Sequence, residues 1–187
     1  MIIVVGNGPS AQPFKNCLTG HTIFACNLAF LDWPVDHLVV KDRPAQLLID
    51  EQHREQMPEH CWCPAKYLIH RDTYRFSDRW LPLEGVLPLN SGAIAIDLAS
   101  RLYPDQPIYV LGFDSAIRPE QPQTTEYQYA FRQGHQITPS VALAHHQTTV
   151  STVNSILAPV VFVSDTPSEH LATIGTAAFT DLLEALK

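Results

Sequence analysis

The chain has 187 residues, of which 45% are hydrophobic and 17% charged, and its formal net charge is −7 at pH 7. This composition is typical of a folded globular domain and excludes a disordered chain. Because neutralising phosphates supplies most of the affinity for nucleic acids, 12 Lys and Arg residues against 19 Asp and Glu residues argue against a nucleic-acid partner.

The chain is expected to be cytoplasmic, without a membrane span. No apolar stretch approaches the roughly 18 residues that cross a bilayer, and the N-terminus enters an apolar run without a charged leader. The four cysteines have no regular spacing, so reduced thiols are expected. Cys61 and Cys63 lack the second pair that a structural zinc site needs, and no metal or other cofactor is predicted.

Apolar, β-branched runs alternate along the chain with segments that can form helices, which predicts an α/β fold. Strands are expected at 2–5, 22–26, 37–40, 66–69, 107–111 and 159–163. Helices are expected at 44–56, 91–102, 148–157 and 176–186, with Ser91 as the N-cap of the second. The first strand is apolar without alternation, the pattern of a strand covered on both faces. We predict a single Rossmann-like domain over 1–187, with a mostly parallel sheet and helices on both faces.

Two long segments do not fit this alternation. Residues 71–90 are rich in aromatic, Arg and Pro residues, and residues 114–147 are polar. Long irregular segments in a compact domain are usually functional or disordered. The second segment follows the strand at 107–111, so it would leave the sheet at the edge where such folds bind ligands. The sequence therefore predicts a lid-like insertion over 114–147.

A glycine-rich turn, with the sequence Gly-Asn-Gly-Pro-Ser, directly follows the first strand. Gly6 and Gly8 allow backbone N–H groups to come close to an anion, and Asn7 and Ser10 add short polar side chains. An ordinary tight turn explains the same residues equally well. The dinucleotide-binding fingerprint is incomplete because Ala11 stands in place of its third glycine, so an NAD site is not predicted.

Three further segments fall at ends of the predicted elements: Cys26-Asn27, Asn90-Ser91-Gly92 and Gly112-Phe113-Asp114. In order and spacing, these segments and the glycine-rich turn resemble the bacterial sialyltransferases that use CMP-sialic acid, whose fold is a single Rossmann-like domain with a small lid. The pattern is also similar to that of a broader group of short, often phage-encoded proteins, which carry an Asp-Arg after the third strand, here Asp42-Arg43.

The resemblance implies a metal-independent, inverting glycosyltransferase that takes a sugar from a nucleotide donor, with a CMP-linked donor as the first expectation. It places Asn7 and Gly8 at the donor phosphate, Asn27 at the nucleotide-sugar, and Ser91 and Gly92 at the sugar or phosphate. A helix N-terminus at Ser91 suits an anion on physical grounds as well, although an ordinary N-cap explains that residue too. The other residues expected to bind substrate are Gly6, Ser10, Asp42, Arg43, Asn90 and Asp114.

The resemblance also implies catalytic residues in and beside the lid. Tyr127 and Tyr129 would hydrogen-bond the leaving phosphate, and His145 or His146 would deprotonate the acceptor hydroxyl. Packing tyrosines and a surface His-His pair explain these residues equally well. The sequence departs from the family where an arginine precedes its Thr-Ser-Gly segment, because Pro88 stands there.

Two other functions stay open. A protein that binds a nucleotide or phosphorylated metabolite without transfer chemistry would fit the loss of that arginine. A distant resemblance to pterin pyrophosphokinases implies instead an enzyme that requires Mg²⁺ and ATP. Asp42 and Asp114 are then the candidate carboxylate ligands of the Mg²⁺. Sialyltransferases of this kind often assemble as tetramers, so Trp33, Trp62 and Trp80 could serve a homo-oligomer interface, although scattered tryptophans are more often core residues.

Overall fold

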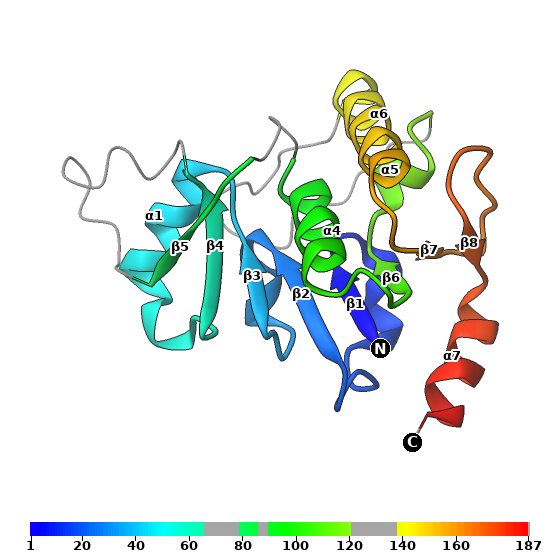
Figure 1. Ribbon diagram of the computed structural model, residues 1–187, viewed down its shortest axis with the longest axis horizontal. Coiled ribbons are helices and arrows are strands. Elements are labelled where there is room, and N and C mark those ends of the chain that lie inside the picture. The colour runs from blue at the N-terminus through cyan, green and yellow to red at the C-terminus, as the bar shows by residue number, and fades with distance from the viewer. Residues whose placement is uncertain (66–78, 86–89, 121–137, 187) are drawn as a thin grey trace.

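The computed structural model describes residues 1–65, 79–85, 90–120 and 138–186, and the strands within them form one parallel sheet in the order β5-β4-β3-β2-β1-β6-β7-β8 (Figure 1). The strands are β1 (Ile2–Val5), β2 (Thr22–Cys26), β3 (His37–Val39), β4 (His60–Pro64), β5 (Trp80–Leu83), β6 (Ile108–Leu111), β7 (Val160–Val163) and β8 (Thr173–Ile174). The predicted α/β fold with a parallel sheet is confirmed.

Helices connect these strands and cover the sheet. The α-helices are α1 (Arg43–Gln52), α4 (Ser91–Leu102), α5 (Asp114–Ile117), α6 (Pro139–Ser155) and α7 (Thr176–Ala185), and short 3-10 helices are η1 (Pro9–Phe14), η2 (Asn27–Leu31) and η3 (Arg54–Gln56). In the described part of the chain, no helix has the length and apolar character needed to span a membrane.

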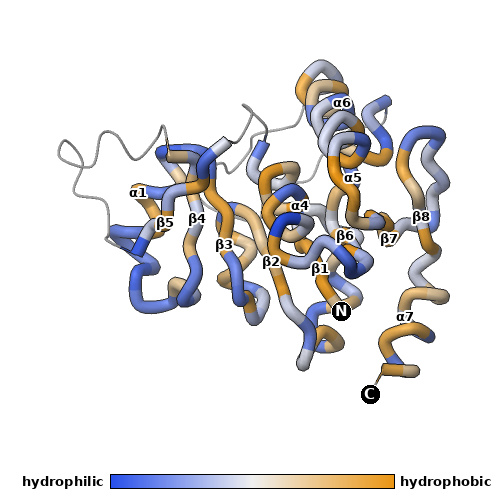
Figure 2. The backbone as a smooth tube through the Cα atoms, in the orientation of Figure 1, coloured by the Kyte–Doolittle hydropathy of each residue, from blue (hydrophilic) through white to orange (hydrophobic). Residues whose placement is uncertain are grey.

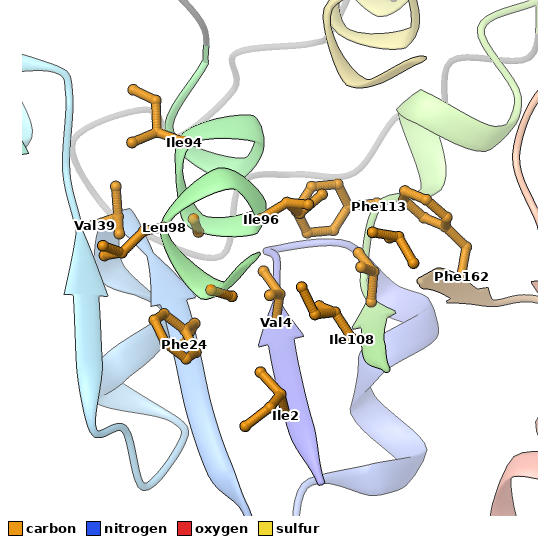
Figure 3. Close-up of a cluster of buried hydrophobic side chains, with 14 of the residues drawn as sticks. Ile2, Val4, Phe24, Val39, Ile94, Ile96, Leu98, Ile108, Phe113 and Phe162 are labelled. Atoms are coloured by element: carbon orange, nitrogen blue, oxygen red, sulfur yellow. The ribbon is translucent and has the colours of Figure 1, made fainter. Parts of the chain in front are cut away.

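The two faces of the sheet carry separate apolar clusters because side chains alternate along each strand. Ile2 and Val4 pack on the face covered by α4, together with Phe24, as Figure 3 shows. Ile3 and Val5 pack on the opposite face with η1 and with Phe179 of α7. Helices therefore cover both faces, as predicted, and β1 is buried along its whole length.

Hydropathy follows this layering (Figure 2). The central strands and the inner stripe of α4 are hydrophobic, whereas the connection between β7 and β8 is strongly hydrophilic. A hydrophilic connection is expected at the surface, where its backbone groups can be solvated. This connection, which begins at Ser164, borders a pocket described below.

Several predicted elements need correction. The fourth strand is at His60–Pro64, where Cys61 and Cys63 alternate into the core, and the predicted strand at 66–69 lies outside the described residues. The segment 71–90, interpreted as irregular, contains β5, whose Trp80 is fully buried. A two-residue strand, β8, was not predicted, because so short a strand has no pattern of its own.

The segment predicted as a lid, 114–147, is helical at both of its ends. It opens with α5, and α6 begins at Pro139 rather than near 148, with the Thr138 side chain accepting a hydrogen bond from the Val141 N–H at 3.4 Å. Thr followed by Pro at the first helical position is a helix-start signal. Residues 121–137 lie outside the described residues, so the lid itself stays a prediction.

The cysteines and two tryptophans are mostly core residues. Burial raises the pKa of the Cys61 thiol to about 12, and Cys63 packs in the same apolar cluster. All four cysteines are free thiols, as expected, and within the described residues no cluster of three or more His, Cys, Asp or Glu side chains is arranged to hold a metal ion. Trp33 and Trp80 are buried, so neither is available for an oligomer interface.

Candidate functional site

The chain reverses its direction of winding between β1 and β6, which are neighbours in the sheet. After β1 the chain enters η1, whose Ala11 and Phe14 pack on one face. After β6 it enters α5, whose Ala116 and Ile117 pack on the other face. Ligands of open α/β sheets bind outside the carboxyl ends of the strands at such a reversal. The predicted turn at residues 6–10 and Asp114 both lie at this point.

The glycine-rich turn is hydrogen-bonded to the loop after β6. The Gly6 N–H donates to the Leu111 carbonyl at 2.8 Å, and the Gly8 N–H donates to the Gly112 carbonyl at 2.9 Å. A Cβ atom on Gly8 would lie 2.6 Å from that Gly112 oxygen. These two N–H groups are therefore engaged with protein carbonyls, and the expected contact of the turn with a donor phosphate stays a prediction. Gly8 is needed for the close approach of two loops.

Asp114 supplies the negative charge next to this turn. Its Oδ2 accepts a hydrogen bond from the Ser10 N–H at 3.4 Å, at the start of η1. The carboxylate of Asp114 thus engages the N–H group of Ser10. The structure brings together Ser10 and Asp114, two predicted site residues separated by 104 positions in the chain.

Three predicted site residues present side-chain oxygens that are buried and have no hydrogen-bond partner within the described residues: Asn7 Oδ1, Ser10 Oγ and Asn27 Oδ1. All three follow the carboxyl ends of β1 or β2. The register pairs Val5 of β1 with Ala25 of β2. Asn7 and Asn27 each come two residues after this pair, so they follow adjacent strands at matching positions. Buried polar atoms without partners are uncommon and costly, and they are expected to be satisfied by a ligand or water.

The backbone at Asn27 is also unusual. Asn27 has φ +55°, the one positive φ among the non-glycine residues that the structure describes. Asn tolerates this left-handed conformation better than most residues, and such positions gather at ligand sites. Before it, Cys26 is buried, and burial together with the charge of Asp42 raises the pKa of its thiol to about 12. Cys26 pairs with Val39 of β3, so Asp42, three residues after Val39, follows the strand next to β2.

The N-terminus of α4 reaches the same edge. Asn90, not Ser91, is the N-cap, because its Oδ1 accepts from the Ala93 N–H at 2.8 Å. The buried Ser91 hydroxyl instead accepts from the Lys41 N–H at 3.1 Å, which ties α4 to the residues after β3. A Cβ on Gly92 would lie 2.7 Å from the Phe113 ring, so this glycine admits an aromatic side chain.

His146, one of the two candidate bases, contacts α5. Its Nδ1 lies 2.6 Å from the Ala116 carbonyl oxygen in α5. Because a carbonyl can only accept, Nδ1 must donate, which leaves Nε2 as the basic atom of the neutral ring. The His170 ring lies beside it, with 5.6 Å between ring centroids. Tyr127 and Tyr129 lie outside the described residues.

The two acidic candidates for a magnesium site do not lie together. Asp42 and Arg43 begin α1 after β3, and Asp114 begins α5 after β6. Strands β2 and β1 stand between β3 and β6. Three strand spacings of about 4.8 Å amount to roughly 14 Å, too far for one ion to be shared by two short carboxylates.

A pocket of about 560 Å³ borders this edge on the side of η1 and α7. Ser10 and Asp114 line it, as do Arg118, Asp165 and Glu184, which the sequence interpretation missed. Asp165 lies two residues after the end of β7, so the rule that ligands bind at carboxyl ends of strands could have found it. The contribution of α7 had no such signal, because a polar helix face normally meets solvent.

Comparison of the chain with family models, with curated proteins and with solved structures finds no match.

Proposed function

We propose that this chain binds a nucleotide-linked sugar at the carboxyl edge of its sheet and transfers the sugar to an acceptor hydroxyl. The observation that carries the proposal is the set of three buried, unpartnered oxygens on Asn7, Ser10 and Asn27 at the point where the winding reverses. Asn Oδ1 atoms accept hydrogen bonds, so they suit hydroxyl groups of a sugar or the amino group of a base. This assigns them to the sugar or nucleoside part of the ligand, away from its phosphate.

In the transfer step, the acceptor oxygen attacks the anomeric carbon, and the nucleoside phosphate leaves with the electrons of the broken C–O bond. His146 Nε2 receives the hydroxyl proton. The hydrogen bond from Nδ1 to the Ala116 carbonyl supports this role, because it fixes the tautomer in which Nε2 is basic. His145 is the second histidine that the sequence named, and it serves as the comparison residue below.

Binding is tested by thermal stabilisation with CMP, CDP, UDP, ATP, NAD and CMP-sialic acid, with and without Mg²⁺. Asn7→Ala and Asn27→Gly each remove one unpartnered oxygen, and glycine keeps the left-handed backbone at position 27. Each lost hydrogen bond should weaken Kd roughly twofold to tenfold, since such a bond contributes about 0.5–1.5 kcal/mol. Asn154→Ala, at an exposed position on α6, is the control and should leave Kd unchanged. If no nucleotide or nucleotide sugar stabilises the protein, the proposal fails.

Transfer is tested by release of free nucleotide from the donor. His146→Gln should reduce turnover about 100-fold or more, in the range of general-base catalysis, with donor affinity kept. His145→Gln should have a much smaller effect. An equal loss in both variants would contradict the assignment of His146.

A second candidate function, nucleotide binding without transfer, is favoured by a different observation. The N–H groups of Gly6 and Gly8 donate to protein carbonyls, and Asp114 accepts from the Ser10 N–H, so the turn does not offer these donors to a transferring phosphate. This candidate predicts stabilisation by a nucleotide with no turnover. In that case His146→Gln and the unchanged protein would behave alike in both assays.

A further inference from the structure

The pocket of about 560 Å³ is formed by elements that are far apart in sequence. Its walls come from η1, from α5 and the residue after it, from the residues after β7, and from one side of α7, where Thr176, Thr180 and Glu184 recur at helical spacing. Its volume lies within the range of about 300–1,000 Å³ that is typical of small-molecule sites. Most of its lining residues are polar or charged, and the buried side chains of Phe14 and Leu183 belong to its apolar part.

The charged groups around the pocket favour a ligand that brings hydrogen-bond donors. Among the described residues, the carboxylates of Asp114, Asp165 and Glu184 line it, against one guanidinium, that of Arg118. Asp165 accepts from the Thr176 N–H at 2.7 Å and from the Thr176 hydroxyl at 2.8 Å, which lowers the pKa of Asp165 and keeps it ionised. Carboxylates only accept hydrogen bonds, and an excess of negative charge repels phosphate and carboxylate ligands.

The pocket shares two residues with the site at the carboxyl edge of the sheet. Ser10 lines it, and the Ser10 Oγ is buried with no partner within the described chain. Asp114 also belongs to both places, because it lines the pocket and accepts from the Ser10 N–H. A molecule in the pocket would therefore lie next to one bound at Asn7 and Asn27.

We propose that this pocket binds a polyhydroxylated small molecule without negative charge, which is the chemistry of a neutral sugar or an amino sugar. Its hydroxyl and amino groups donate to the carboxylates, and its carbon skeleton packs on the apolar side chains of Phe14 and Leu183. The pocket is then a saccharide subsite beside the edge where the nucleotide-linked sugar is proposed to bind, an assignment that rests on the proposed function.

The test is titration of the purified full chain with glucose, galactose, lactose and glucosamine, with binding measured by ligand-observed NMR or calorimetry. Ala177→Trp places a large side chain into the pocket from an exposed position that lines it. Ala178→Trp makes the same change at the next position, which is also exposed and does not line the pocket. We expect at least one saccharide to bind, with an affinity at least tenfold lower in Ala177→Trp and unchanged in Ala178→Trp.

The charge argument has its own variants. Glu184→Gln removes a carboxylate from the pocket, whereas Asp181→Asn removes one from an exposed position on α7 that does not line it. Glucosamine affinity should fall several-fold in Glu184→Gln only. The proposal is overturned if no saccharide binds, if both tryptophan variants bind equally, or if glucose 6-phosphate binds more tightly than glucose. Saccharide binding without nucleotide binding would remove the proposed transfer alone, and nucleotide binding without saccharide binding would remove the pocket assignment alone.

Discussion

Replacing Gly8 with alanine tests the close contact between the loops after β1 and β6. The alanine Cβ would lie 2.6 Å from the Gly112 carbonyl oxygen and 2.8 Å from its carbon, next to the Asp114 carboxylate. Gly8 has φ −76° and ψ 151°, an extended conformation that alanine adopts without strain. Any loss of stability would therefore come from contact rather than from backbone conformation.

The size of the effect follows from two opposing contributions. Overpacking costs about 1–3 kcal/mol, and the upper part of that range applies because the backbone atoms of Gly112 cannot rotate away. Alanine also restricts the unfolded chain, which stabilises the protein by about 0.4–1 kcal/mol. The free energy of unfolding should thus fall by about 1.5–2.5 kcal/mol, and Tm should fall by roughly 3–10 °C at about 2–4 °C per kcal/mol.

Gly175→Ala is the matched control, since Gly175 also precedes a helix and has φ −64° and ψ 153°. Its added Cβ would meet the Asp165 carboxylate oxygen at 3.3 Å, and the nearby group is a side chain that can move. Urea unfolding of both variants, with the slopes compared, gives the two free energies. If Gly8→Ala is as stable as Gly175→Ala within about 0.5 kcal/mol, the loops do not need a glycine for close approach, and the reasoning is refuted.

Two further predictions concern titratable groups. Burial and the nearby His60 lower the pKa of His37 below 6.5, with Asp36 opposing. The unfolded chain therefore binds more protons, and the free energy of unfolding should fall as the pH drops from 6.5 towards the pKa of the folded protein. His37→Gln should reduce this pH dependence of the urea midpoint between pH 7.5 and 5, and an unchanged dependence would contradict the prediction. Cys17 is exposed, whereas Cys26, Cys61 and Cys63 are buried. Iodoacetamide should therefore label Cys17 alone in the native protein. Rapid labelling of two or more cysteines would show that this burial is wrong.

The sequence by itself determined the class of the fold and much of its central part. The apolar run Ile2–Val5 is buried on both faces, because its lack of alternation already indicated a doubly covered strand. The helix at 91–102 has the predicted bounds, since its apolar stripe and its polar start are both local signals. The same local patterns located Asn7 and Asn27 at strand ends, where the structure has unpartnered oxygens.

Only the tertiary structure decided how these residues are used. Pairing of β1 with β6 brings Gly112 next to Gly8. As a result, the N–H groups of the glycine-rich turn, which the sequence suggested could bind an anion, donate hydrogen bonds to carbonyls of β6 and of the loop after it. The N-cap of α4 is Asn90 and not the predicted Ser91. The Ser91 hydroxyl accepts a hydrogen bond from the Lys41 N–H, 50 residues away in the chain. The pocket depends on the position of α7 against η1, which joins the two ends of the chain. Contacts between distant segments arise from tertiary packing, and the local propensities of the residues do not predict them.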